Sequence, residues 1–443
     1  MKPFIHVRQD SPLLDTPVWL RAGNLTPGGV FTIHAAMYDN LGTKWESSAK
    51  YRADGNGEID LAAAEPLAGS YSSADAAGLF WSMTPVPNAE RRERTPLKAL
   101  VTEFTLMNEG KVLASEPVSR QLVAPGIERL PVREDDLIGT FFRHAAGDLR
   151  PTIVVLGGSE GGLRESTAAL LASHGFNALA LAYFGLEGLP EELVNVPIET
   201  VGRAIEWLRG QPDVQMGKLG VVGTSKGGEL ALLSASFFPA IKAVAAFVPS
   251  GVVYPGLGRT PGSSWQVNGE PLPFAYGKVP DEVTADVQRA KRQNTPISWR
   301  DTYKYWETGE TSAEIPVERI KGPVLLLSGG DDRLWPADWL SERVIDRLKR
   351  YHHPFDAVHN CYPDAGHSLG VPGMPTSQSA VSSYGNGMTL SLGGTPAANA
   401  AAQYRAWHEL VHFLQTHLAG NPAAMSNSQR LGGGTHAIAD PQM

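Results

Sequence analysis

The stretch of residues 219–232 constrains the fold of this chain more than any other. It begins with a short apolar run, residues 219–222, typical of a buried parallel strand, and continues into an Ala- and Leu-rich run, residues 226–238, with helical spacing. Between the runs lies the pattern Gly-x-Ser-x-Gly, centred on Ser225. A serine on so tight a turn has strained backbone angles, and glycine two residues to either side avoids a collision. The stretch therefore predicts a nucleophile elbow, with an ordinary Gly-rich turn as the alternative.

The rest of the chain divides into two parts with different patterns. Residues 1–130 contain short alternating runs separated by Gly, Pro and Asn turns, which indicates an all-β sandwich. Residues 136–420 alternate apolar runs with helical patterns, which predicts an α/β fold: a mostly parallel sheet with helices on both faces. The aromatic-rich segment 250–316 interrupts this alternation and is expected to cap the carboxyl edge of the sheet. Residues 376–395 are expected to form a long surface loop, and residues 421–443 a disordered tail.

A serine nucleophile needs a base, and the base needs a carboxylate that orients it. In an α/β-hydrolase these groups follow in the chain order Ser, Asp or Glu, His, each on a loop after a strand. His367 lies in a Gly-His turn after the apolar run 357–362, which makes it the candidate base. Asp331 and Asp332 compete for the role of the acid after the strand at 324–328. The position three after Gly329 favours Asp332, and Asp331 would then cap the turn or the next helix.

The oxyanion of an acyl-transfer reaction needs two amides aimed at the developing charge. The elbow supplies the amide of Lys226, and the Gly-rich loop 157–162 is expected to supply the second, with Ser159 as the first choice. The alternative for this loop, a phosphate cradle, lacks both the Walker Lys-Ser/Thr and a complete G-x-G-x-x-G.

Lys226 stands at a helix N-terminus, where a cation opposes the helix dipole at a cost of roughly 0.3–1 kcal/mol. Glu229 follows three residues later, within reach of the Lys226 side chain. We therefore expect Lys226 to turn away from the oxyanion site and pair with Glu229 or another carboxylate. The alternative is a lysine extended into solvent.

Composition excludes several classes of function. The net charge of −8 argues against nucleic acid or an anionic membrane surface as the main partner. The single cysteine, Cys361, allows no internal disulfide and no Cys-rich metal site. No run approaches the length of a membrane span, and the N-terminus lacks an apolar signal core, so the expected location is cytoplasmic. The sequence carries no signal for the oligomeric state.

At this point the motifs resemble one family: the acyl-coenzyme A thioesterases, grouped with bile acid-coenzyme A:amino acid N-acyltransferase. The resemblance extends to about residue 420, and it implies that the all-β sandwich of residues 1–130 is immunoglobulin-like. The matching stretches are residues 47–49, 53–54, 57–61, 69–71, 78–83, 170–176, 181–184, 225–231, 315–323 and 361–367. Carried over residue by residue, the family's triad falls on Ser225, Asp332 and His367. Two departures stand out, Gly228 where alanine is usual and a poor match over residues 256–308, where the acyl chain would lie.

The resemblance implies hydrolysis of an acyl-CoA thioester to a free fatty acid and coenzyme A through an acyl-enzyme, without a metal or organic cofactor. A serine nucleophile, as at Ser225, is typical of the thioesterase branch, whereas the amino-acid transferase uses cysteine. The alternatives are a carboxylesterase or dienelactone-hydrolase-like esterase, acyl transfer to an amine, and a binding protein without activity. The coenzyme A phosphates would need basic residues, for which Lys291, Arg292 and Lys304 are candidates beside the simpler interpretation as surface charges.

Overall fold

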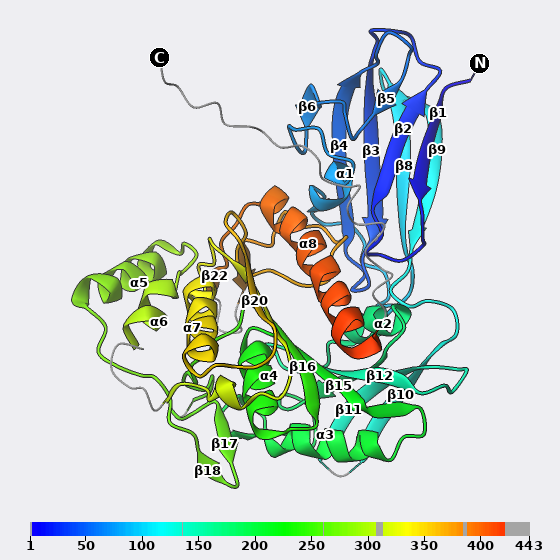
Figure 1. Ribbon diagram of the computed structural model, residues 1–443. Coiled ribbons are helices and arrows are strands. Elements are labelled where there is room, and N and C mark those ends of the chain that lie inside the picture. The colour runs from blue at the N-terminus through cyan, green and yellow to red at the C-terminus, as the bar shows by residue number, and fades with distance from the viewer. Residues whose placement is uncertain (1, 135, 260, 307–312, 384–387, 421–443) are drawn as a thin grey trace, which may run out of the picture.

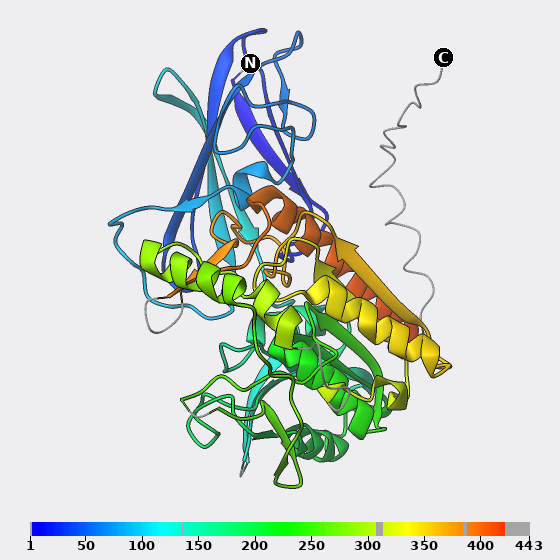
Figure 2. The same cartoon turned by 90° about the vertical axis from the view of Figure 1, so that its left-hand side faces the viewer.

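The computed structural model describes residues 2–134, 136–259, 261–306, 313–383 and 388–420, so the predicted tail at 421–443 lies outside the described residues. The N-terminal residues form an all-β part and the following residues an α/β part, and the two lie against each other (Figure 1). Helix α8 (Pro396–Leu414) lies between the N-terminal strands and the sheet of the α/β part in both views (Figures 1 and 2). No helix of the described residues is long and apolar enough to cross a membrane.

The N-terminal part contains two antiparallel sheets, with strand orders β1-β2-β5 and β6-β4-β3-β8-β9, and with β7 beside β4. Alternate residues of β3, such as Phe31, Ile33 and Ala35, are buried, and they pack with Val18 and Leu20 of the other sheet in one core. A short helix, α1 (Gly78–Trp81), packs on this core. The strands are β1 (Phe4–Gln9), β2 (Val18–Gly23), β3 (Val30–Tyr38), β4 (Lys44–Arg52), β5 (Ile59–Asp60), β6 (Ala68–Gly69), β7 (Thr84–Pro85), β8 (Leu100–Asn108) and β9 (Lys111–Arg120).

The α/β part is built on one large sheet with the strand order β10-β11-β13-β12-β15-β16-β19-β20. The pairs β10–β11 and β11–β13 are antiparallel, and the remaining pairs are parallel. Every residue of β13 is buried, as expected for a strand that is covered on both faces. The strands are β10 (Ile127–Glu134), β11 (Leu137–His144), β12 (Arg150–Leu156), β13 (Asn177–Ala182), β15 (Val214–Thr224), β16 (Ile241–Phe247), β19 (Val324–Gly329) and β20 (Ala357–Tyr362).

Helices cover both faces of the large sheet, which confirms the predicted α/β arrangement. Apolar residues of α3 (Glu199–Arg209) and α4 (Lys226–Phe237) belong to one core cluster, and those of α2 (Glu165–Ser173) and α8 to another. Helix α7 (Ala337–Arg350) contributes to both clusters, and α8 ends in a short π-helical turn, η3 (Gln415–Ala419). The strand order, the antiparallel second strand and the helices on both faces define an α/β-hydrolase fold.

The segment expected to cap the sheet contains two helices, α5 (Asp281–Gln293) and α6 (Arg300–Trp306). It also contributes β17 (Trp265–Val267) and β18 (Glu270–Pro271) to a small sheet with β14 (Val196–Pro197), and is followed by the 3₁₀ turn η2 (Val317–Arg319). Residues 376–395 were expected to form a long surface loop, but their described residues include two short antiparallel strands, β21 (Val381–Ser383) and β22 (Thr389–Ser391), and Leu392 contacts the histidine loop. Residues 384–387 of this stretch lie outside the described residues.

Buried polar contacts join the N-terminal part to the α/β part. Asp15 Oδ2 accepts hydrogen bonds from Trp407 Nε1 of α8 at 2.6 Å and from His174 Nε2 at 2.5 Å. The wholly buried Arg120 donates from Nη1 to the carbonyl oxygen of Gly373 at 2.7 Å. Thr376 N donates to the carbonyl oxygen of Trp81 at 2.9 Å. The segment that follows His367 is therefore anchored on the N-terminal part.

Candidate active site

Ser225 occupies the predicted turn between β15 and α4, with φ 57° and ψ −121°, angles that a residue with a side chain rarely adopts. Its amide donates to the carbonyl oxygen of Phe247, and its own carbonyl accepts the first helical hydrogen bond, from Glu229 N. A Cβ on Gly223 would lie 2.0 Å from the carbonyl oxygen of Gly227. A Cβ on Gly227 would lie equally close to a carbonyl oxygen of the loop after β12. These close contacts leave no space for a side chain at either position, so both residues must be glycine.

Hydrogen bonds connect the three residues expected to form a triad. Ser225 Oγ lies 2.9 Å from His367 Nε2, and His367 Nδ1 lies 2.7 Å from Asp332 Oδ2. All three residues are buried. With Nδ1 protonated and bonded to the carboxylate, Nε2 is free to accept the proton of the serine hydroxyl. The structure brings together Ser225, His367 and Asp332 from loops after three different strands of the large sheet.

The two neighbouring aspartates have different environments. Asp332 is fully buried, and its Oδ1 accepts hydrogen bonds from the amides of Leu334 at 2.9 Å and Trp335 at 3.2 Å, which fix the carboxylate. Asp331 instead pairs with Arg333 at 2.6 Å and accepts a hydrogen bond from Gly394 N at 2.9 Å. Asp331 thus holds the turn, which is one of the two roles that the sequence suggested for it if Asp332 is the acid.

The backbone around His367 is fixed by residues that the sequence analysis did not single out. His367 N donates to the carbonyl oxygen of Leu392 at 2.7 Å, and Gly366 N donates to Oδ1 of the buried Asn399 at 2.8 Å. Asn399 lies in the first turn of α8, which begins after Thr395. The first turn of α8 and the chain after β22 therefore set the position of the imidazole.

The two residues expected to supply oxyanion amides, Lys226 and Ser159, line the same cavity as Ser225. The loop that carries Ser159 is close to the nucleophile, because a Cβ on Gly158 would lie 3.4 Å from Ser225 Cβ. The Tyr183 hydroxyl, which donates to the Gly157 carbonyl oxygen at 2.6 Å, holds this loop. The oxyanion role of the two amides remains a prediction.

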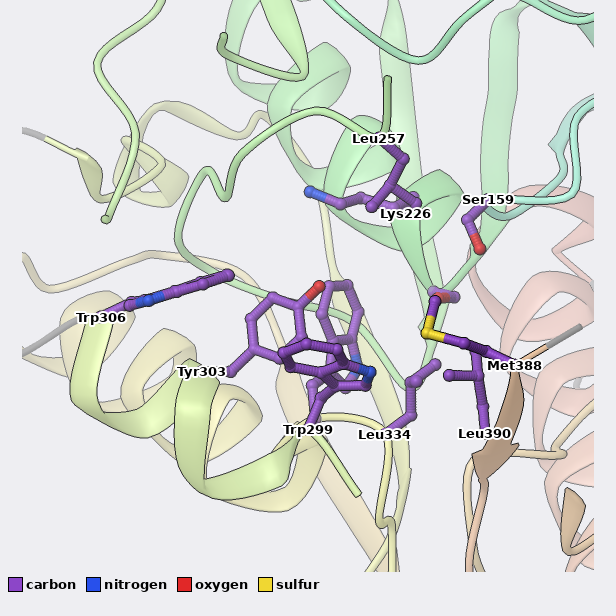
Figure 3. A pocket seen from close by; sticks show the side chains of 11 residues that line it. Ser159, Lys226, Leu257, Trp299, Tyr303, Trp306, Leu334, Met388 and Leu390 are labelled. Carbon is purple, nitrogen blue, oxygen red and sulfur yellow. The ribbon is translucent and has the colours of Figure 1, made fainter. Parts of the chain in front are cut away.

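The side chain of Lys226 forms a buried ion pair with Glu229, as the sequence predicted. Lys226 Nζ lies 3.1 Å from Glu229 Oε2 and donates to Ser264 Oγ at 2.8 Å, while Glu229 Oε1 accepts from Trp265 Nε1 at 2.7 Å. Burial lowers the pKa of Lys226 and raises the pKa of Glu229, and each charge opposes the shift of the other. The Lys226 side chain runs away from Ser159 (Figure 3). Lys226 thus links the nucleophile helix to residues 254–265.

An apolar cavity of about 210 Å³ opens at Ser225 (Figure 3). Its aromatic wall is formed by Trp299, Tyr303 and Trp306 of the predicted cap and by Trp335. The sequence analysis did not identify the individual lining residues, and the only signal for them was the aromatic content of residues 250–316. Besides Ser159, Ser225 and Lys226, the residues that line the cavity are Leu257, Trp299, Tyr303, Trp306, Leu334, Trp335, Met388 and Leu390.

A second, more polar groove of about 640 Å³ also includes Ser159 and Ser225. Its lining contains Thr224, His367 and Gln403 together with an ion pair between Arg164 and Glu160. Ser225 therefore lies where an apolar cavity meets a polar groove. The remaining lining residues of the groove are Leu163, Glu165, Ser166, Thr167, Leu334, Ser368, Leu369, Gly370, Val371, Ser382, Ser383, Leu390 and Leu392.

The three basic candidates for phosphate contacts lie on the segment expected to form the cap. Lys291 and Arg292 are in the last turn of α5, which has no buried residue, and Lys304 is on α6. The ammonium of Lys291 lies 5.8 Å from the ring centre of Trp299, which lines the apolar cavity. Among the described residues, no group of three or more His, Cys, Asp or Glu side chains could hold a metal ion.

A chain of Ser, His and Asp hydrogen bonds on loops of such a sheet, with the serine on a strained elbow, defines the class of α/β-hydrolases. Comparisons with known proteins give the family. Residues 15–134 match the model of the acyl-CoA thioester hydrolase/BAAT N-terminal region, and residues 196–420 match that of the BAAT / acyl-CoA thioester hydrolase C terminal. The chain belongs to this family.

Relatives with similarity over nearly the whole chain carry the same family name. Acyl-coenzyme A thioesterase 1 of Homo sapiens is 32% identical over 416 residues, which cover 92% of this chain and 94% of the relative. The enzyme of the same name from Rattus norvegicus is 32% identical over 420 residues, covering 93% and 96%. Among solved structures, a puromycin-hydrolyzing peptidase of Mycobacterium tuberculosis covers 93% of this chain and 67% of its own, with 14% identity and a TM-score of 0.43.

Proposed function

We propose that the protein hydrolyses acyl-CoA thioesters with Ser225 as nucleophile, His367 as general base and acid, and Asp332 as the carboxylate that orients the histidine. The observation that carries this proposal is the continuous hydrogen-bond chain from Ser225 Oγ through His367 to Asp332, at the junction of the apolar cavity and the polar groove. An acyl-CoA has the same division, with an apolar acyl group on one side of the thioester and a polar carrier on the other. Relatives named acyl-coenzyme A thioesterases support the choice of substrate.

The reaction has two steps. His367 Nε2 takes the proton of the Ser225 hydroxyl as Oγ attacks the thioester carbonyl, and the oxyanion is stabilised by the amides of Lys226 and Ser159. When the C–S bond breaks, the thiolate of coenzyme A leaves with the proton from His367, and the acyl group stays on Ser225 as an ester. His367 Nε2 then takes a proton from a water molecule that attacks this ester. When the second oxyanion collapses, the ester C–O bond breaks, His367 returns the proton to Ser225 Oγ, and the carboxylic acid is released.

The proposal extends to the organisation of the chain. We infer that the N-terminal part is an immunoglobulin-like sandwich, supported by its two antiparallel sheets with a shared core. Because β10 pairs within the large sheet, we place the boundary of this domain before Ile127 rather than at residue 130. The catalytic domain extends to about residue 420, and residues 250–316 serve as its cap.

A cytoplasmic location also stays a prediction, because relatives include a mitochondrial form. A fluorescent fusion of the full chain would test it.

The experiment is a thiol-release assay with the purified full chain and acyl-CoA esters from acetyl to palmitoyl. We expect release of coenzyme A by the native protein and none by Ser225→Ala. Labelling of the native protein by a fluorophosphonate probe, lost in Ser225→Ala, reports the nucleophile independently. Turnover of p-nitrophenyl esters without turnover of any acyl-CoA would replace this proposal by an esterase, and amide formation from added glycine or taurine would replace it by an acyltransferase. Absence of both labelling and turnover in the folded protein would indicate a binding protein.

A further inference from the structure

The apolar cavity has a wall of aromatic rings in contact with one another. It begins at the imidazole of His367, whose ring centre lies 5.8 Å from that of Trp335 in an edge-to-face arrangement. Trp335 is followed by Tyr303 at 5.7 Å, and Tyr303 by Trp306 at 5.1 Å. Trp306 lies at the end of the cavity away from Ser159 (Figure 3). The wall therefore leads from the reaction centre along the whole cavity.

Hydrogen bonds and further ring contacts fix this wall in place. Trp335 is 2% exposed, and its Nε1 donates to the carbonyl oxygen of Val248 at 3.1 Å. The Tyr254 hydroxyl donates to the carbonyl oxygen of Tyr303 at 3.1 Å, and the two tyrosine rings pack edge to face at 4.7 Å. Trp306 packs on Tyr276 at 5.1 Å. Rings held in this way offer a preformed surface to a planar ligand, with little entropy left to lose on binding.

Among the described residues that line the cavity, none offers an unpaired counter-charge to a charged acyl group. Lys226 is the one cation of this described lining, and its ammonium is already paired with Glu229 and bonded to Ser264. The remaining lining consists of the aromatic wall, aliphatic side chains, Met388 and two serines. A second carboxylate on the acyl group would lose its hydration here without gaining a counter-charge.

The volume of the cavity sets how much of an acyl group it can bury. An apolar protein cavity of about 150 Å³ binds benzene, which has six carbon atoms. By proportion, the 210 Å³ found here hold about eight to nine carbon atoms. This is about half of a palmitoyl chain, so a palmitoyl group would leave many methylene groups outside the cavity.

Resting on the thioesterase function proposed above, we propose that the substrates are thioesters of compact, uncharged acyl groups that carry an aromatic ring, of the size of phenylacetyl, and that Trp306 limits acyl length. Edge-to-face or offset contacts between the substrate ring and the wall favour a ring over an alkyl chain of equal carbon number by about two- to tenfold.

The test compares kcat/KM of the full-length protein for phenylacetyl-CoA, octanoyl-CoA, succinyl-CoA and palmitoyl-CoA. We expect phenylacetyl-CoA to exceed octanoyl-CoA by about two- to tenfold, and both to exceed succinyl-CoA and palmitoyl-CoA. A highest value for palmitoyl-CoA or succinyl-CoA, or octanoyl-CoA equal to or above phenylacetyl-CoA, overturns the inference and leaves the thioesterase function intact. Failure to hydrolyse any acyl-CoA refutes the proposed function itself.

Trp306→Ala tests the length limit, and Trp339→Ala is the matched control. Trp339 lies on α7 outside the apolar cavity and packs under the guanidinium of Arg343 at 5.1 Å. We expect Trp306→Ala to raise the ratio of palmitoyl-CoA to phenylacetyl-CoA turnover by about tenfold, consistent with the loss of an aromatic contact and added space, and Trp339→Ala to leave it unchanged. The ratio of the two turnover values, measured on the same variant, does not depend on the fraction of folded protein. If Trp306→Ala does not fold, Trp306→Leu replaces it. An unchanged ratio in the Trp306 variant, or equal changes in both positions, contradicts the length limit.

Discussion

Replacing Glu229 by glutamine tests the buried ion pair behind the nucleophile. The Lys226 and Glu229 side chains are 3% and 0% exposed, so neither charge is screened by water. Glutamine keeps the volume and can still accept a hydrogen bond from Trp265 Nε1, but it leaves Lys226 without a counter-charge. Removing one partner of a buried pair costs about 3–5 kcal/mol. Because Ser264 Oγ at 2.8 Å and a carbonyl oxygen at 3.4 Å still accept from Lys226 Nζ, we expect the lower end, about 3 kcal/mol.

The pH dependence of this loss has a definite sign. Burial holds the pKa of Lys226 below its ordinary value of 10.5, and the lost carboxylate was the group that opposed this shift. In Glu229→Gln the unfolded chain therefore binds more protons than the folded protein between the lowered pKa and 10.5, so stability rises with pH in that window. The deficit relative to the native protein should shrink from about pH 7 to about pH 10.

The assay is urea unfolding followed by tryptophan fluorescence, with the double variant Lys226→Met/Glu229→Gln as the control. Because the double variant buries no charge, it should recover most of the loss seen in Glu229→Gln alone. A loss below about 1 kcal/mol in Glu229→Gln, the size of an exposed pair, would refute the claim that the pair is buried in the folded protein. A deficit that grows with pH would refute the assigned direction of the Lys226 shift.

Three further experiments, two of them with a matched control variant, test the site. Asp332→Asn should lower turnover by about 10⁴-fold, as expected for a wrong histidine tautomer. The neighbouring variant Asp331→Asn should mainly lower stability. A larger loss of turnover in Asp331→Asn than in Asp332→Asn would reverse the assignment of the acid. Gly227→Ala should lower the free energy of unfolding by about 3 kcal/mol, because its Cβ would lie 2.0 Å from a carbonyl oxygen. Gly217 has open space around it, so Gly217→Ala should be nearly neutral in the same urea titration. Ser225→Cys forms a thioester intermediate that amines attack, so mass spectrometry should detect acyl-glycine at high glycine concentration, and free acid as the sole product would contradict this.

The hydrogen-bonded arrangement of Ser225, His367 and Asp332 could be predicted from the sequence because each of its parts depends on a local pattern. The Ser225 elbow is specified by two glycines within five residues, and the loops of Asp332 and His367 each follow a short apolar run. Parallel strands end at the same edge of a sheet, so residues 142 positions apart in the chain, Ser225 and His367, meet there. The pairing of Lys226 with Glu229 was predictable for the same reason, since side chains three residues apart on a helix are neighbours.

Features that depend on pairing between distant segments could not be predicted in this way. The strand β10 lies near residue 130, where the all-β pattern gives way to the α/β pattern. Its residues alone do not indicate whether it pairs with the N-terminal sheets or with the large sheet, which it joins through β11. Met388 and Leu390 line the cavity from a Ser- and Gly-rich stretch that has the composition of a surface loop. Trp299 and Trp306 belong to a segment without regular periodicity, so their aromatic character was visible but their common orientation was not.

The contacts of Arg120 with Gly373 and of Trp81 with Thr376 have a consequence for how such proteins evolve. No described residue of the N-terminal part bonds to Ser225, His367 or Asp332, yet this part supports the segment that follows His367. A catalytic half separated from its partner by gene rearrangement would have to find a new support for that segment before it regained full activity. The contacts therefore predict that the two halves depend on each other, and both family models match this one chain.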